Sequence, residues 1–167
     1  MKIYIFDLDD TLLYKPYRSY KDIQLDYELQ RLLEDCKYPK YIFSNATTGH
    51  VDESLKQIGI YHHFTSKFTR DNVPLMKPYP AGYRYVNTNV LFQNVNLDYY
   101  YNDDVDIYFF DDLLENLITA KKFGWTTIWI QDTEEYYPFV DYQFKTIIDA
   151  LTFFKKLETG QSYNQLL

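Results

Sequence analysis

Short runs of apolar residues recur along the chain and predict the strands of a sheet. Most of these runs are continuous rather than alternating, which is typical of strands that are covered on both faces. The five runs predicted as strands are Lys2–Phe6, Lys40–Phe43, Phe64–Phe68, Asp106–Phe110 and Trp125–Ile130. We therefore expect a buried sheet.

Between these runs, apolar residues recur with a period near 3.6, which predicts helices. The predicted helical faces are Leu25–Cys36, Val51–Ile58, Leu113–Lys121 and Phe144–Leu157. Gly59 and Gly124 are placed to end the second and third of these helices. Pro80–Leu97 is predicted as a further helix because Pro80 suits a first helical turn, although Gly82 weakens its interior.

The alternation of strands and helices predicts the fold class. It favours an α/β protein with a three-layer, doubly wound, Rossmann-like parallel sheet of about five strands. A chain of 167 residues is enough for one such domain. We expect a single domain over residues 1–159, with 160–167 as a frayed tail.

Composition narrows the function classes. Apolar residues make up 46% of the chain, so a hydrophobic core is expected. The net charge of −7 disfavours nucleic acid as a partner, because the phosphate backbone is itself negatively charged. Cys36 is the only cysteine, so no internal disulfide can form. The apolar stretch Ile3–Phe6 is too short for a signal peptide or a membrane span. We expect a cytoplasmic protein that does not bind membranes.

Polar residues follow the predicted strands at the ends where parallel sheets bind ligands. They are Asp7, Asp9 and Thr11 after the first strand, Ser44 and Asn45 after the second, Asp111 and Asp112 after the fourth, and Lys77 after a loop beyond the third. Four carboxylates brought together repel one another unless a cation is present or their pKa values rise. Mg²⁺ prefers such oxygen ligands.

In their order along the chain, these residues resemble the four motifs of the haloacid dehalogenase superfamily of phosphotransferases. The first motif runs from Asp7 to Thr11, the second is Phe43–Asn45, the third is Lys77–Pro78 and the fourth is Phe110–Asp112. The resemblance covers roughly residues 2–130. All four motifs lie in sequence order at predicted strand ends, so chance turn-forming acids are a poor explanation.

This resemblance implies a Mg²⁺-dependent phosphatase. Asp7 would be the nucleophile that forms an aspartyl phosphate, and Asp9 the general acid and base. Asp7 and Asp111 would bind Mg²⁺ through their carboxylates, and Asp9 through its backbone carbonyl. Ser44 and Lys77 would hold phosphate oxygens as charge develops on them.

The remaining site residues have supporting roles by the same resemblance. Thr11 and Asn45 are expected to contact the substrate. Asp112 is expected to support the metal's ligands rather than to replace Asp111. Asn116 lies one helical turn beyond Asp112, so its side chain is predicted to brace the loop that carries the acids.

Details around the second and fourth motifs resemble the pyrimidine 5′-nucleotidases, so a small phosphorylated metabolite such as a nucleotide is the expected substrate. Those relatives carry a helical cap, whereas Tyr14–Pro39 and Ala46–Met76 are too short for a sizeable one. A second copy of the chain could supply a lid. A macromolecular phosphate as substrate, and a non-catalytic interaction module that keeps the fold, remain alternatives.

Several further residues have competing interpretations. The aromatic and basic segment Tyr14–Tyr20 is either a rim that contacts substrate or an ordinary loop. His50, His62 and His63 lack the spacing of metal ligands, and we interpret them as surface or packing residues. Lys67 is a rival to Lys77, which we favour because it precedes Pro78 and a predicted helix.

Overall fold

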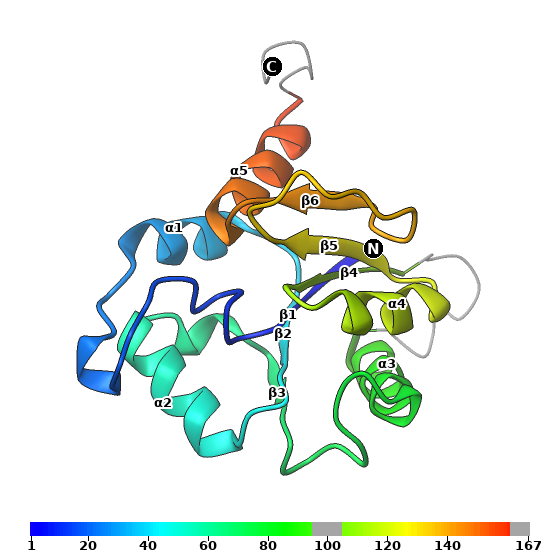
Figure 1. Ribbon diagram of the computed structural model, residues 1–167, viewed down its shortest axis with the longest axis horizontal. Coiled ribbons are helices and arrows are strands. Elements are labelled where there is room, and N and C mark those ends of the chain that lie inside the picture. Colours follow the sequence, from blue (N-terminus) through cyan, green and yellow to red (C-terminus); the bar gives the residue numbers. More distant parts are fainter. Residues whose placement is uncertain (95–104, 161–167) are drawn as a thin grey trace.

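The computed structural model describes residues 1–94 and 105–160. Within them, six strands form one parallel sheet in the order β3-β2-β1-β4-β5-β6 (Figure 1). The strands are β1 (Lys2–Phe6), β2 (Lys40–Phe43), β3 (Ser66–Phe68), β4 (Asp106–Asp111), β5 (Thr126–Ile130) and β6 (Tyr142–Phe144). The predicted three-layer, doubly wound α/β class is confirmed, with one strand more than predicted.

Helices cover both faces of the sheet (Figure 1). They are α1 (Tyr27–Asp35), α2 (Thr48–Ile58), α3 (Pro80–Asn94), α4 (Leu114–Lys122) and α5 (Ile147–Glu158). The apolar faces of α1, α2 and α5 pack on one side of the sheet, and those of α3 and α4 on the other. Phe110 faces the first side and its neighbour Phe109 faces the second. Burial on both faces explains why the strand sequences are continuously apolar.

A capping side chain fixes where α1 begins, and a glycine fixes where α2 ends. Asp26 accepts a hydrogen bond from the backbone N–H of Leu29 and starts α1. The prediction that Leu25 lies on the buried face of this helix is wrong, because Leu25 precedes the cap and is 51% exposed. Gly59 ends α2 with a φ of 87°, as its position predicted.

The segment before α5 differs from its prediction. Phe144 does not belong to the last helix; it pairs with Ile130 as the final residue of β6. Thr146 then starts α5, because its side chain accepts from the N–H of Asp149 while the Asp149 carboxylate accepts from the N–H of Thr146. A half-buried strand of three residues is too short to show a period of its own.

Smaller differences lie at other boundaries. β3 begins at Ser66 because Phe64 ends a short 3₁₀ turn, Tyr61–His63. The last three positions of the predicted helix Pro80–Leu97, and residues 161–167 of the predicted tail, lie outside the described residues.

None of the described helices has the length and apolar character needed to cross a bilayer.

The sheet order places a topological switch point between β1 and β4. From β1 the chain continues to β2 and β3 on one side, and from β4 it continues to β5 and β6 on the other. Phe6 and Phe110 are register partners, and the N–H of Asp7 donates to the carbonyl of Phe110 at 2.9 Å. The residues that follow, Asp7 and Asp111, are therefore side by side at the crevice where such sheets bind ligands.

Candidate active site

A buried lysine joins the carboxylates at the ends of β1 and β4. Lys77 Nζ lies 2.8 Å from Asp7 Oδ1 and 2.6 Å from Asp111 Oδ2. The Lys77 side chain is only 1% exposed and that of Asp111 is fully buried. Three residues predicted as functional, from distant parts of the sequence, thus meet at the switch point.

Both carboxylate oxygens of Asp111 accept as many hydrogen bonds as they can. Asn116 Nδ2 donates to both carboxylate oxygens at 3.0 Å, and the N–H of Leu113 donates to Oδ1 at 2.8 Å. Together with Lys77, each oxygen of Asp111 accepts two donors, which is its capacity. Asp111 is therefore an anchor for Lys77 and for the start of α4.

Asn45 holds the backbone of Lys77 in place. Its Nδ2 donates to the carbonyl of Lys77, and its Oδ1 accepts from the N–H of Lys77, both at 2.8 Å. The peptide bond between Lys77 and Pro78 is cis. Because both ends of the Asn45 amide are used in this way, its side chain positions Lys77, and the geometry gives no support to the predicted substrate contact.

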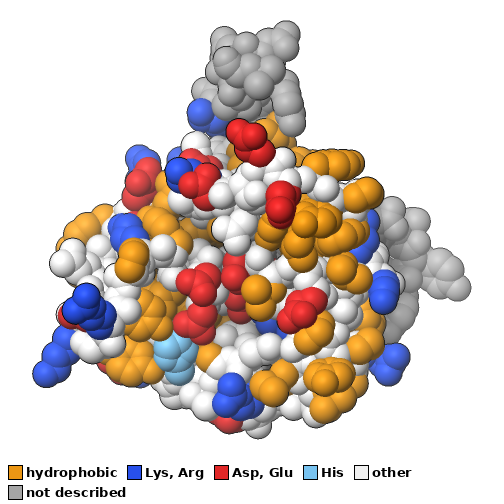
Figure 2. Space-filling model, in the orientation of Figure 1, with side chains coloured by type: hydrophobic (Ala, Val, Ile, Leu, Met, Phe, Trp, Pro, Cys, Tyr) orange, Lys and Arg blue, Asp and Glu red, His pale blue; other side chains and the backbone are white. Residues whose placement is uncertain are grey.

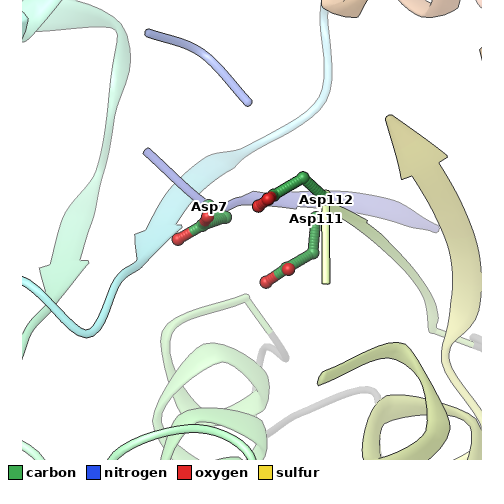
Figure 3. A group of neighbouring side chains, drawn as sticks. All are labelled: Asp7, Asp111 and Asp112. Carbon is green, nitrogen blue, oxygen red and sulfur yellow. The ribbon is translucent and has the colours of Figure 1, made fainter. Parts of the chain in front are cut away.

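Asp112 adds a third carboxylate beside Asp7 and Asp111. One oxygen from each of the three lies within 4.8 Å of the other two. Figure 3 shows the three side chains directed into a common space from the ends of β1 and β4. Set against a single buried ammonium, three carboxylates leave an excess of negative charge, and such an oxygen-rich group fits a hard divalent cation.

Burial and repulsion between neighbouring acids raise the pKa values of Asp7 and Asp112. Burial, aided by Asp111, raises the pKa of Asp7 to about 8 despite the opposing charge of Lys77. Burial and Asp111 likewise raise the pKa of Asp112 to about 6. Burial lowers the pKa of Lys77, but Asp111 and Asp7 outweigh it and the net direction is upward. A bound cation would favour the ionised acids.

An open cavity of about 360 Å³ lies over these residues. In Figure 2, acidic side chains gather near the centre of the visible face. The cavity is lined by Asp7, Asp9, Asp10, Ser44, Asn45, Ala46, Arg70, Lys77, Asp112, Leu113 and Asn116. Asp112 lines the cavity, whereas the fully buried Asp111 does not.

The side chains of Ser44 and Thr11 differ in their access to this cavity. Ser44 lines it, and because Ser44 Oγ accepts from the N–H of Ala46 at 3.1 Å, its own O–H is left to donate. Thr11 is fully buried and is not part of the lining. Its hydroxyl has no partner among the described residues, so the geometry does not support the predicted contact between Thr11 and substrate.

Asp9 is bound by a histidine that was not predicted from the sequence to belong to the site. His50 Nε2 lies 2.8 Å from Asp9 Oδ1, and the Tyr17 hydroxyl donates to the same oxygen at 3.4 Å. The Tyr20 hydroxyl lies 2.7 Å from His50 Nδ1. The interpretation of His50 as a surface or packing residue did not include this contact with Asp9, whereas His62 and His63 lie apart in the turn before β3.

Sequence reasoning also missed Arg70, which lines the cavity and donates through Nε to the carbonyl of Asn45 at 3.0 Å. The sequence does contain a signal that could have identified both Arg70 and His50. Arg70 follows β3 by two residues, and His50 is in the first turn of the helix after β2. The rule that ligands bind at the carboxyl ends of strands applies to these positions as it does to Asp7.

The structure also bears on two choices left open by the sequence, between Lys67 and Lys77 and between the two interpretations of the Tyr14–Tyr20 segment. Lys67 Nζ lies 3.9 Å above the ring of Tyr61 and 3.3 Å from Asp52, away from the site, so Lys77 is the lysine at the acids. The Tyr14–Tyr20 segment does not line the cavity over Asp7. Part of it encloses a different cavity of about 250 Å³ with Asp26, and only its Tyr17 reaches Asp9.

No family model matches the chain, and no curated protein matches it in sequence. Solved structures do match. A haloacid dehalogenase (HAD) phosphatase from Thermococcus onnurineus is 19% identical, with a TM-score of 0.63 over 92% of this chain and 98% of the other. An uncharacterised protein from Listeria monocytogenes serotype 4b is 20% identical, with a TM-score of 0.62 over 95% and 99%.

A dehalogenase shares the architecture as well. The L-2-haloacid dehalogenase from Xanthobacter autotrophicus, solved with chloropropionic acid covalently bound, is 14% identical, with a TM-score of 0.62 over 86% of this chain and 64% of the other. The chain thus has the haloacid dehalogenase fold that these phosphatases and dehalogenases share.

Proposed function

We propose that this chain is a Mg²⁺-dependent phosphomonoester hydrolase that acts through an aspartyl phosphate on Asp7. The observation that carries the proposal is the position of Asp7. It lies at the switch point of the sheet, at a cavity, with one oxygen held 2.8 Å from Lys77. Asp9 lines the same cavity, so a nucleophile and an acid–base group are brought together.

The reaction has two steps. In the first, an oxygen of Asp7 forms a bond to phosphorus, the bond to the leaving oxygen breaks, and protonated Asp9 gives its proton to that oxygen. In the second, a water molecule attacks the phosphorus of the aspartyl phosphate, Asp9 accepts a proton from the water, and the bond between phosphorus and the Asp7 oxygen breaks. Inorganic phosphate leaves and free Asp7 is regenerated.

Hydrogen-bond donors around Asp7 suit the charge that develops on the phosphoryl oxygens. The free O–H of Ser44 and the backbone N–H groups that follow it would donate to these oxygens. Lys77 offsets the charge of Asp7 from the buried side of the site, where its ammonium contacts the carboxylates of Asp7 and Asp111. Arg70 is an exposed cation on the cavity wall and would meet an anionic substrate.

The donor set fits Mg²⁺. The carboxylates of Asp7 and Asp112, together with the backbone carbonyl of Asp9, would hold the ion. Asp111 is less suited because each of its oxygens already accepts two donors. When bound, Mg²⁺ would reduce the repulsion between Asp7 and an incoming phosphoryl group.

We infer that the substrate is a small phosphorylated metabolite, such as a nucleotide, because the cavity is open and of modest volume. A second copy of the chain would provide the water exclusion that a cap provides elsewhere. Specific activity that rises with protein concentration would support such a lid, and specific activity independent of concentration would remove it.

The test is a screen of nucleotides, sugar phosphates and aryl phosphates with Mg²⁺, comparing wild type with Asp7→Asn. Asp106→Asn is a matched control, because Asp106 is exposed at the opposite end of β4. We expect phosphate release by wild type and by the control, and none above background by the Asp7 variant. Equal activity in all three proteins, or in none, would contradict the proposal.

A further inference from the structure

A chain of hydrogen bonds runs from the surface to Asp9. Tyr20 contacts His50 Nδ1 at 2.7 Å, and His50 Nε2 contacts Asp9 Oδ1 at 2.8 Å. The backbone of His50 is held at the start of its helix, because Thr47 caps α2 and accepts from the backbone N–H of His50. The three residues come from the segment after β1 and from the start of α2, which the fold brings together.

The chemistry of these groups fixes the direction of the hydrogen bond between His50 and Asp9. An ionised carboxylate only accepts, so His50 Nε2 carries the proton that it shares with Asp9 Oδ1. In a neutral ring, Nδ1 is then an acceptor and the Tyr20 hydroxyl donates to it, whereas in a protonated ring Nδ1 donates to the Tyr20 oxygen. In either form Tyr20 holds the ring so that Nε2 donates to Asp9.

The same contacts divide the two oxygens of Asp9 between two tasks. Oδ1 accepts from His50 and from Tyr17. A proton that Asp9 exchanges with substrate or water thus belongs on Oδ2. Since the Asp9 side chain is 43% exposed, packing alone does not restrict its rotamers, and these hydrogen bonds do.

We propose that His50 is a positioning residue for Asp9, and that it directs Asp9 Oδ2 toward the oxygen of the leaving group. The hydroxyl of Tyr20 holds the ring of His50 in this position through its hydrogen bond to Nδ1. The inference rests on the proposed function and extends it, because it names the part of the reaction that His50 serves. That part is proton transfer to the leaving group, rather than attack by Asp7 or binding of phosphate.

A consequence for the substrate follows. Proton transfer matters most when the leaving oxygen is strongly basic, as in an alkyl phosphate such as a sugar or nucleoside phosphate. It matters least for nitrophenyl phosphate, whose leaving group departs as a stable anion. The contribution of His50 should therefore depend on the leaving group, which a merely structural residue would not show.

The kinetic test compares His50→Ala, His50→Gln and Tyr20→Phe on an alkyl phosphate that wild type hydrolyses and on nitrophenyl phosphate. His50→Ala should lower kcat for the alkyl phosphate about tenfold or more, and for nitrophenyl phosphate no more than about threefold, with KM little changed. His50→Gln should recover most of the rate, because its amide can donate to Asp9. Tyr20→Phe should show the same pattern as His50→Ala with a smaller loss.

His62→Gln is the matched control and should leave both rates unchanged, because His62 is exposed and lies outside the site. Equal losses on both substrates, or no loss on either, would overturn the proposal. So would a His50→Gln variant as slow as His50→Ala.

A spectroscopic readout separates this inference from the proposed function. In nitrogen-15 spectra of the imidazole rings, Nε2 of His50 should carry a proton, and Asp9→Ala should change the His50 signals but not those of His62. An unchanged His50 spectrum in Asp9→Ala would remove the pairing itself. A wild type that shows the pairing but hydrolyses no phosphate ester would instead contradict the proposed function.

Discussion

Lys77 and Asp111 form an ion pair of 2.6 Å in which neither side chain has appreciable contact with solvent. Asp7 shares the same ammonium at 2.8 Å. Removing charges from water is costly, so these groups depend on one another far more than a surface pair would. Lys77 therefore has a structural task, to keep two carboxylates together, besides any contact with substrate.

Replacement of Lys77 by Met should destabilise the protein strongly. Met has a similar length but no charge, so Asp7 and Asp111 would lose their partner while still buried. We expect a loss of about 3–5 kcal/mol in the free energy of unfolding, measured by urea denaturation without divalent ions. Lys67→Met is the control; it removes a more exposed pair with Asp52 and should cost about 1 kcal/mol or less. Equal costs would show that Lys77 does not neutralise the acids.

Asp112 and Asp111 should respond differently to amide substitution. Asp112→Asn should weaken Mg²⁺ binding about tenfold or more, measured by calorimetry, because one oxygen ligand loses its charge. The apo stability of this variant should equal or exceed that of wild type, because the neutral amide removes the repulsion between Asp112 and Asp111. Asp111→Asn should instead lower the apo stability, because Lys77 loses its shorter ion pair. The reverse assignment would be correct if Asp111→Asn abolished Mg²⁺ binding and Asp112→Asn left it intact.

Asp26 should make the stability of the protein depend on pH. Burial raises the pKa of Asp26, but hydrogen bonds from Lys15, the N–H of Leu29 and Tyr14 outweigh it and leave the pKa below its usual value. The folded protein thus binds the proton less tightly than the unfolded chain. The stabilisation is complete above the ordinary carboxyl pKa of about 3.9 and is lost as the pH falls through the lower folded value.

Asp26→Asn isolates this effect, because Asn also caps a helix but carries no charge. At pH 7 the variant should be less stable than wild type by about 1 kcal/mol. The difference should shrink as the pH falls below about 4. Urea denaturation at several pH values measures it, and a gap that stays constant into strong acid would show that the ionised form of Asp26 is not favoured.

Gly82→Ala should destabilise the protein even though Ala is the better helix former. The backbone of α3 approaches the loop before Lys77 so closely that a Cβ atom at Gly82 would collide with the carbonyl oxygen of Leu75. Helix propensity alone would predict a gain of about 1 kcal/mol. We expect a net loss by thermal unfolding, and reduced activity because the loop leads to Lys77. Gly49→Ala is the control, since nothing lies near its Cβ position. A more stable Gly82→Ala variant would contradict this explanation.

Most of the helices and strands, and the positions of the acids relative to them, could be predicted from the sequence. Continuous apolar runs such as Lys2–Phe6 reveal buried strands, and Gly59 reveals a helix end, because these signals depend on neighbouring residues only. Asp7 and Asp111 were predicted to be neighbours, since parallel strands end at one edge of the sheet. The short strand β6 has no such local signal and was missed.

The partner of each side chain in the site became clear only from the folded structure. Asp111 and Asp112 are adjacent in the sequence, yet Asp111 is buried against Lys77 and Asp112 lines the cavity. Asn45 binds the backbone of Lys77, and His50 binds Asp9 across 41 positions of sequence. Such pairings depend on the direction of individual side chains and on the register of distant strands. A local pattern of apolar and polar residues does not encode either.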